Sequence, residues 1–444
     1  MIKSAYLIVI IIILLALPGA VFGAQRFPPP QFSTGHELPT TTQPNPRADS
    51  YEYLDTIVLL AALCLASYLA LKKRSRRGLF VLGILSLAYF GFWRKGCVCS
   101  IGAIQNVVLA LFDRSYTVPV TVIIFFTLPL IFTLFFGRTF CASVCPLGAI
   151  QDLFLLKPVK VPHWLEQALR MFAYLYLGLA ILFAATSSAF IICEYDPFVA
   201  FFRRSGNFSM LLLGACLLLV GIFIGRPYCR YLCPYSILLG WMSRASKWHL
   251  TITPDKCIQC RLCEDSCPFD SIQKPTQDQT RSRGEGKKRL AVLIGLLPIF
   301  IALGVLLGVW AGAPLSRVNA TVGLAEQIWL EDSGQVKEIT EPSDAFRRTG
   351  RPAEELYQEA SDLNRKFVIG GGILGAFLGL VIGMKLIGLS VSRSRTDYEI
   401  DHSSCVSCGR CMPYCPVERS VNKAKNPEAG SESALTGSEI HDRD

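Results

Sequence analysis

The stretch Gly137-Arg138-Thr139-Phe140-Cys141-Ala142-Ser143-Val144-Cys145-Pro146-Leu147 decides how this chain is organised. It returns as Gly225-Arg226-Pro227-Tyr228-Cys229, followed by Cys233-Pro234-Tyr235. Cysteines four positions apart fall on one face of a helix, so each copy predicts a pair of thiols that point the same way. If the two copies face each other, Cys141, Cys145, Cys229 and Cys233 form a candidate metal site. The alternative is that these four pack as free thiols or dithiols among helices.

The sequence around both copies is apolar. Hydrophobic residues make up 51% of the 444 residues and charged residues only 18%, and the mean hydropathy is +0.40. A transmembrane helix needs about 20 apolar residues, and seven stretches approach or exceed that length. The sequence therefore predicts an all-α polytopic membrane protein with about seven spans after a signal peptide. The predicted spans are 54–71, 78–93, 117–136, 169–193, 208–225, 290–313 and 367–391.

Basic residues at the ends of the spans set the predicted orientation. Residues 72–77, Lys-Lys-Arg-Ser-Arg-Arg, join the first two spans, and a second basic segment, 281–289, precedes the sixth. Basic loops favour the cytoplasmic side, so both segments are assigned inside and the other loops alternate. Spans two and three then form one unit and spans four and five another, which is a parallel two-span repeat. The inner cysteine pairs of both units fall on the cytoplasmic side.

Three further cysteines fall on the outer side, namely Cys97, Cys99 and Cys193. A weaker echo supports a role for them, because residues 99–106 and 145–152 share Gly-Ala-Ile-Gln after the cysteine. The three are candidate ligands of a second membrane redox site, but the sequence shows no obvious fourth ligand. A disulfide between two of them is the alternative, since the periplasm is oxidising.

The most specific motif is a repeated cysteine run. Two runs have the form C-x2-C-x2-C-x3-C-P, which is the bacterial ferredoxin pattern for [4Fe–4S] clusters. A structural zinc site is the alternative, but zinc usually takes separated C-x2-C pairs. The eight predicted cluster ligands are Cys257, Cys260, Cys263, Cys267, Cys405, Cys408, Cys411 and Cys415.

Two predicted spans and an outer loop separate the runs. Both spans carry glycine at every fourth position, at 304, 308 and 312 and at 371, 375, 379 and 383, which lets helix backbones approach closely in lipid. The resulting hairpin would join the runs into one split, bacterial-ferredoxin-like 2[4Fe–4S] cytoplasmic module. We expect Cys415 to complete the cluster of the first run and Cys267 that of the second. If each run keeps its own fourth cysteine, the ligand residues are unchanged.

The chain divides accordingly. The predicted segments are a signal peptide or N-terminal anchor (1–24), a periplasmic Pro-rich tether (25–53), a five-span bundle with the cysteine repeat (54–245), the first ferredoxin run (246–289), span six (290–313), a periplasmic loop (314–366), span seven (367–391), the second ferredoxin run (392–416) and a disordered tail (417–444).

These motifs together resemble a known family. The paired Gly-Arg-x-x-Cys-x3-Cys-Pro segments, the turn at residues 195–198 after Cys193 and the two ferredoxin runs are similar to those of the membrane polyferredoxins of the NapH and NosR type. The resemblance implies electron transfer between a quinol or cytoplasmic donor and a periplasmic reductase or its maturation system. A NosR-like protein would carry a periplasmic flavin-binding domain before the spans, whereas only the Pro-rich tether precedes them here.

The predicted function is that of a membrane electron-transfer protein in the bacterial cytoplasmic (inner) membrane, with two [4Fe–4S] clusters. The predicted partners are the lipid bilayer and redox proteins on one or both sides, and no nucleic acid. Further iron-sulfur centres in the bundle and binding of quinol, quinone or flavin stay open, as does whether the chain acts as a quinol dehydrogenase-like subunit of an oxidoreductase. No catalytic residue is assigned. The alternative function is an iron-sulfur redox sensor or a metallocentre-assembly factor.

Overall fold

The computed structural model describes residues 49–96, 99–203, 208–252, 257–276, 283–336, 339–390 and 395–416. The predicted signal segment, nearly all of the tether, Cys97 and the polar tail lie outside these residues. Within them the chain is mostly helical, with one two-stranded sheet. The helical class predicted from the sequence therefore holds for the described part of the chain.

The elements run in the following order: α2 (Asp49–Ser67) with a π-helical end (Tyr68–Lys72), α3 (Arg76–Ser86) with a π-helical end (Leu87–Trp93), α4 (Ala103–Phe112), α5 (Val120–Phe136), the π-helix η3 (Phe140–Val144), α6 (Pro146–Phe154), α7 (His163–Ala185), α8 (Ile191–Tyr195), α9 (Pro197–Arg203), α10 (Phe208–Val220), α11 (Pro227–Tyr231), α12 (Pro234–Arg244), α13 (Leu262–Asp265), β1 (Ile272–Gln273), α14 (Arg283–Ser316), α15 (Ala320–Asp332), α16 (Glu341–Arg348), α17 (Ala353–Ser390), β2 (Glu399–Ile400) and the 3-10 helix η5 (Met412–Tyr414).

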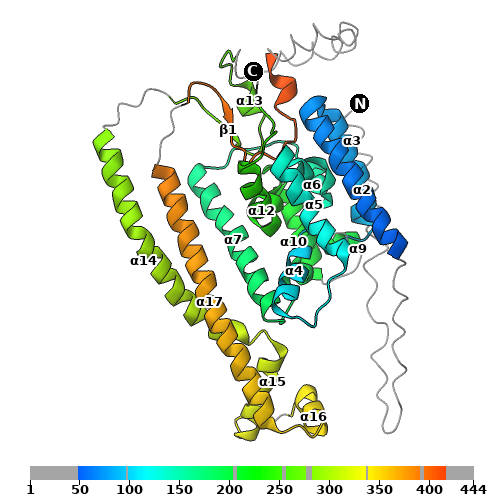
Figure 1. Ribbon diagram of the computed structural model, residues 1–444, viewed down its shortest axis with the longest axis vertical. Coiled ribbons are helices and arrows are strands. Elements are labelled where there is room, and N and C mark those ends of the chain that lie inside the picture. Colours follow the sequence, from blue (N-terminus) through cyan, green and yellow to red (C-terminus); the bar gives the residue numbers. More distant parts are fainter. Residues whose placement is uncertain are drawn as a thin grey trace.

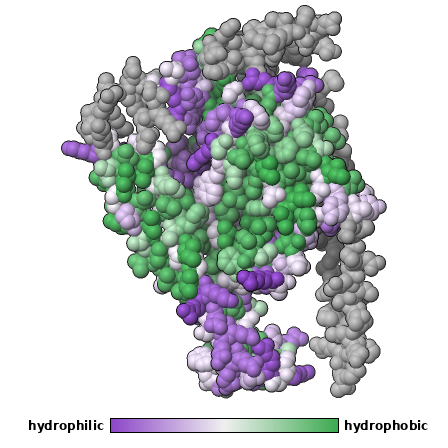
Figure 2. All heavy atoms as spheres, in the orientation of Figure 1, coloured by the Kyte–Doolittle hydropathy of each residue, from purple (hydrophilic) through white to green (hydrophobic). Residues whose placement is uncertain are grey.

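A broad apolar band crosses the middle of the molecule, and polar residues gather at its ends (Figure 2). Within the described residues, four helices are long and apolar enough to cross a membrane: Ser50–Lys72, His163–Ala185, Lys288–Ser316 and Ala353–Ser390. Large apolar side chains point outward from them; Trp310 is 77% exposed and Leu306 is 68% exposed. An exposed apolar surface of this kind suits lipid. The chain is therefore a membrane protein.

The other predicted spans are helical but shorter. α5 has 17 residues, α10 has 13, and α3 with its π-helical end covers residues 76–93. The predicted span 169–193 also differs, because α7 ends at Ala185 and Cys193 lies in the separate helix α8. The count of seven spans thus remains a prediction.

Helices α14 and α17 form a hairpin that stands beside the bundle and packs on α7 (Figure 1). Their glycines face each other at the contact. A methyl group on Gly375 would overlap the carbonyl oxygen of Gly304, and one on Gly371 would overlap that of Gly308. The two backbones therefore touch, as the glycine spacing predicts.

The largest hydrophobic core surrounds the two Cys-Pro segments. It contains Leu147, Ile150 and Tyr235, and it also contains Cys145 and Cys233. Both cysteines are less than 8% exposed. These two thiols lie inside the bundle, where a polar or charged group without a partner costs free energy.

The two ends of the molecule differ. The sheet β1–β2 and both ferredoxin runs lie at one end, and α15 and α16 lie at the other (Figure 1). The predicted basic loop is at the ferredoxin end, because Arg76 donates to the carbonyl oxygen of Cys408 over 3.1 Å and Arg74 donates to that of Thr251. At the opposite end, Ala325 and Ile328 of α15 pack on Leu356 of α17.

Candidate metal centres

The two ferredoxin loops share one backbone conformation. In the first, Gln259 (φ 52°) and Arg261 (φ 64°) flank Cys260; in the second, Ser407 (φ 52°) and Gly409 (φ 69°) flank Cys408. Left-handed conformations are unfavourable for residues with a side chain. Alternation of right- and left-handed residues turns successive backbone N–H groups inward, which makes a concave site for an anion. Both loops are therefore shaped to hold an anionic group.

Strand pairing joins the two runs. β1 and β2 are antiparallel, with Ile272 opposite Ile400, and the N–H of Asp401 donates to the carbonyl oxygen of Ser271 over 2.8 Å. β1 directly follows the first run and β2 directly precedes the second. The loops thus lie together despite the hairpin between them.

Cys267 of the first run lies with the cysteines of the second. It packs against the hydrophobic cluster of Phe269, Val406 and Cys408, and its charge acts on Cys405 and Cys411. It also packs, together with Cys411, against the cluster that contains Cys263. On the other side, α13, which contains Cys263, packs against η5, which directly precedes Cys415. This arrangement agrees with an exchange of fourth cysteines between the runs.

Metal ligation by the cysteines of the runs requires their thiols to lose their protons. Burial raises the pKa of the Cys405 thiol to about 12 and that of the Cys263 thiol to about 11, so metal binding must displace their protons. Among the described residues, no three His, Cys, Asp or Glu side chains lie close enough to share one metal ion. The thiolates of a cubane bind separate irons and lie further apart than ligands of one zinc ion. The eight thiols of the two C-x2-C-x2-C-x3-C-P runs are the donors that two [4Fe–4S] clusters take.

The membrane cysteines sit at breaks between helices. Cys145 and Cys233 each precede a proline that begins a helix, Pro146 of α6 and Pro234 of α12. Proline has no N–H to donate and is favoured at the first helical position. Each C-x3-C pair consequently spans two short elements, which differs from the expectation of one continuous helical face.

The breaks nevertheless bring the inner cysteines together. Cys145 is in electrostatic contact with Cys229 and Cys141, and Cys233 is in contact with Cys229, Cys145 and Cys141. The Nε2 of Gln151 donates to the sulfur of Cys229 over 3.2 Å. The four predicted inner cysteines, the inner group, therefore lie in one region of the bundle, with Cys145 and Cys233 buried and Cys141 and Cys229 partly buried.

Two of the predicted outer cysteines also meet. A Cβ placed on Gly102 would lie 3.2 Å from the sulfur of Cys193 and 3.9 Å from the Cβ of Cys99. Cys99 is in electrostatic contact with Cys193 and with Cys145 of the inner group. The third predicted residue, Cys97, is outside the described residues.

The second ferredoxin loop rests directly on the inner group. Cys141 packs against the hydrophobic cluster that Phe269, Val406 and Cys408 form with Cys267. Arg138 spans the same contact, because it donates to the carbonyl oxygen of Ser403 over 3.0 Å and to the sulfur of Cys141 over 3.8 Å. No gap separates the two groups of cysteines.

Asp152 lies at the contact between the second ferredoxin loop and the Cys-Pro repeat, and it binds residues from both. Its carboxylate pairs with Arg76 at 2.7 Å, Arg226 at 3.4 Å and Arg410 at 3.3 Å. Arg410 belongs to the second ferredoxin loop, and Arg226 also donates to the carbonyl oxygens of Cys141 and Ala142. One buried carboxylate thus links the loop, the basic segment and the Cys-Pro repeat.

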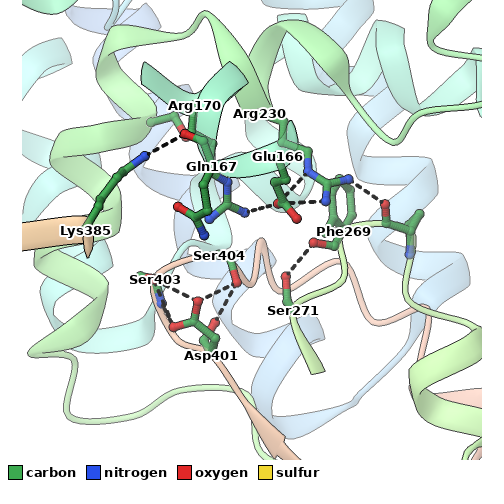
Figure 3. A network of polar contacts seen from close by, with 12 residues as sticks. Glu166, Gln167, Arg170, Arg230, Phe269, Ser271, Lys385, Asp401, Ser403 and Ser404 are labelled. Carbon is green, nitrogen blue, oxygen red and sulfur yellow. Dashed lines mark hydrogen bonds and ion pairs between the residues drawn. The ribbon is translucent and has the colours of Figure 1, made fainter. Parts of the chain in front are cut away.

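A second polar network ties α7 to both the hairpin and the first run (Figure 3). Glu166 pairs with Arg170 at 2.6 Å and with Arg230 at 2.7 Å. Arg230 in turn donates to the carbonyl oxygen of Pro268 over 3.2 Å, and Lys385 of α17 donates to that of Gln167 over 3.2 Å. Pro268 follows Cys267, so this network fixes the end of the first run.

Changing Asp152 to Asn is expected to loosen the contact between the second ferredoxin loop and the Cys-Pro repeat. Removing one partner of a buried ion pair typically costs about 3–5 kcal/mol, because the remaining charge stays buried. We expect a lower unfolding midpoint in detergent and earlier loss of the absorption of the ferredoxin module. The matched control is Glu359→Gln, which breaks the exposed pair with Arg351 at 2.8 Å and should change stability by less than about 1 kcal/mol. Equal midpoints for both variants would contradict the assigned role of Asp152.

Asp152, Glu166 and Gln151 were not predicted as site residues. The Gly-Ala-Ile-Gln echo pointed to Gln151, but nothing in the sequence pairs Asp152 with three arginines from three distant segments. Such pairing depends on the fold.

Comparison with known proteins gives the chain its relatives. A family described as a 4Fe-4S binding domain matches residues 117–164 and 207–253, which are the two copies of the Cys-Pro repeat. A second family with the same description matches residues 250–273 and 398–418, the two ferredoxin runs. No solved structure matches significantly.

Several curated proteins are similar over part of the chain. The putative electron transport protein YccM of Escherichia coli is 29% identical over 31% of this chain and 43% of its own. The protein NirI of Paracoccus denitrificans is 32% identical over 31% of this chain and 22% of its own. The regulatory protein NosR of Pseudomonas aeruginosa is 27% identical over 49% of this chain and 33% of its own. The matches thus span less than half the length of each of these three relatives.

Proposed function

Because this chain belongs to the NapH/NosR-type family of ferredoxin-containing membrane proteins, we propose that it relays electrons across the cytoplasmic membrane. The path would join a donor at one face, either a cytoplasmic protein or quinol, to a periplasmic reductase or its maturation system. The chain would use two [4Fe–4S] clusters at the ferredoxin end and thiolate-held centres within the bundle. Such clusters supply one-electron redox chemistry.

The observation that carries the proposal is the contact of Cys141 with the cluster formed by Cys408, Phe269 and Val406. Ferredoxin clusters at one face cannot by themselves serve chemistry across about 30 Å of hydrocarbon. Cys141 of the inner group packs against the second ferredoxin loop, and the charge of Cys99 acts on Cys145 of the same group. Cysteines thus follow one another from the ferredoxin module into the bundle.

The ligands would be assigned as follows. Cys257, Cys260, Cys263 and Cys415 would hold the first cluster, and Cys405, Cys408, Cys411 and Cys267 the second. Cys141, Cys145, Cys229 and Cys233 would form the inner membrane site, and Cys99 and Cys193, with Cys97 as predicted, the outer one.

Arginine side chains would tune this path. Arg138 and Arg226 are buried, 5% and 1% exposed, and both contact Cys141 through its sulfur or carbonyl oxygen. Fixed positive charge beside thiolates stabilises their charged form. The residues would therefore hold negative charge at the step between the ferredoxin module and the bundle.

The orientation follows from charge. The basic segment at residues 72–77 contacts the ferredoxin module, and basic segments favour the cytoplasm. The ferredoxin runs would therefore lie in the cytoplasm and the α15–α16 end in the periplasm.

The test is electron transfer through sealed proteoliposomes. Dithionite is added outside, and the reduction of trapped ferricyanide is followed by its absorbance. We expect a protein-dependent rate that falls at least tenfold in Cys145→Ser, while the absorption of the ferredoxin clusters is retained. Cys216→Ser is the matched control, because Cys216 is exposed on α10. A full rate in Cys145→Ser would overturn the conduit and favour the sensor or assembly function.

A further inference from the structure

The outer cysteines lie in a structural copy of the inner site. The side-chain oxygen of Gln105 accepts a hydrogen bond from the N–H of Ile192 over 3.0 Å. In the same way, that of Gln151 accepts one from the N–H of Tyr228 over 3.0 Å. Gln105 and Gln151 occupy the same position of the Gly-Ala-Ile-Gln echo, and each donor directly precedes a cysteine, Cys193 or Cys229.

The copy extends through the following residues. α8 and α11 are both five-residue helices, with Cys193 and Cys229 as their third residues. After α11 the chain reaches Cys233, which directly precedes the proline that begins α12. After α8 it reaches Asp196, which directly precedes the proline that begins α9.

The backbone at these two positions is nearly the same. Cys233 has φ −64° and ψ 113°, and Asp196 has φ −78° and ψ 111°. An aromatic residue follows each proline, Tyr235 in one copy and Phe198 in the other. Asp196 therefore corresponds to Cys233 in backbone conformation and in its place before the proline, although it follows Cys193 by three residues whereas Cys233 follows Cys229 by four.

The segments that begin at Cys99 and Cys145 correspond as well. The sulfur of Cys99 accepts a hydrogen bond from the N–H of Gly102 over 3.4 Å, and Gly148 holds the same place after Cys145. The charges of Asp196 and Cys193 act on the Cys99 thiol. Cys99, Cys193 and Asp196 thus correspond in position to Cys145, Cys229 and Cys233 of the inner site.

Asp196 is 3% exposed. Its Oδ1 accepts from the N–H of Phe198 over 2.9 Å, whereas its Oδ2 has a hydroxyl, that of Tyr228, at 3.5 Å. Since a carboxylate oxygen has two lone pairs, the carboxylate keeps capacity for a further partner. The positive charge of Arg203 also acts on this carboxylate. Burial of a charged carboxylate is costly, and ligation of a cation is one way to offset that cost.

We propose that Asp196 is the missing ligand of the outer site and, with Cys99 and Cys193, holds an iron-sulfur centre through mixed thiolate and carboxylate ligation. The inference rests on the proposed function, because it takes the inner site to be metal-bound. The three side chains are not close enough to enclose one ion, but neither are the cysteines of the ferredoxin runs, among the described residues. The proposal is accordingly for a cluster, in which each side chain would bind its own iron.

The test separates ligation from capping of α9. Asparagine caps a helix about as well as aspartate but does not offer a charged oxygen ligand. We expect Asp196→Asn to lose the same amount of iron and acid-labile sulfide per chain as Cys99→Ala, with the ferredoxin signals in electron paramagnetic resonance unchanged. Asp196→Cys should keep the iron with an altered spectrum. The matched control is Glu194→Gln, which removes an exposed carboxylate two residues away.

Full iron in Asp196→Asn would show that Asp196 only caps α9 and would overturn the inference. Zinc in place of iron would overturn it as well. The proposed function has its own readout, because Cys145→Ser is scored by electron transfer across vesicles. A chain that needs Cys145 for flux but keeps its iron in Asp196→Asn would retain the conduit and lose the outer ligand.

Discussion

Replacement of Gly375 by leucine is expected to force α14 and α17 apart and to make the ferredoxin runs lose iron. A side chain at this position would overlap the carbonyl oxygen of Gly304, and the backbone of a helix cannot move aside as a side chain can. Overpacking of this kind costs about 3 kcal/mol. Since the hairpin carries the two runs to their shared sheet, iron per chain and the unfolding midpoint in detergent should both fall.

The control for this experiment lies in the same hairpin. Gly295 of α14 has no atom within 4 Å of an added Cβ, so Gly295→Leu should leave the iron content and the midpoint as they are. Retention of iron and midpoint in Gly375→Leu would show that the runs associate without a close helix contact.

Cys267→Ala is expected to remove the cluster of the second run, although the residue belongs to the first. Cys267 packs against the cluster that contains Cys408, and its charge acts on Cys405 and Cys411 of the second run. Loss of one thiolate from a four-cysteine site should destabilise the cluster enough to lose it during purification. Iron per chain and the electron paramagnetic resonance of the reduced protein measure the loss.

Double variants identify the shared cluster. Cys267→Ala combined with Cys408→Ala should lose no more iron than either change alone, because both residues would serve one cluster. Cys267→Ala combined with Cys260→Ala should lose both clusters. The opposite pattern would mean that each run keeps its own fourth cysteine.

The parts of the fold that sequence could predict are those that depend on local pattern. Glycine at every fourth position of α14 and α17 indicated a close backbone contact, and Gly304 and Gly375 make it. Basic residues indicated which loops share a side, and Arg76 contacts the ferredoxin loop. Both signals are periodic or compositional, so they can be read from the sequence without knowledge of the fold.

Other features depended on contacts between distant segments. A hydropathy pattern that looks for full spans does not detect short helices such as α4, α6 and α12. The four-residue spacing of the cysteines suggested one continuous helix, but Pro146 and Pro234 each begin a new helix at that point. Asp152 meets its three arginines only in the folded chain. Asp196 was seen in the sequence beside Cys193, but only the backbone match with Cys233 gives it a place in a site.

The strand pair that joins the ferredoxin runs also fixes an order of assembly. Ile272 and its partner Ile400 lie on opposite sides of the hairpin in the sequence, so the ribosome must complete α14, the α15–α16 segment and α17 before β2 exists. Until then β1, which follows the first run, has no partner strand, and the second run is not yet present to bury the thiols of the first. In the proposed function, a module with both halves can therefore take up its clusters only after α17 and β2 have been synthesised, which places cofactor loading late in the life of the nascent chain.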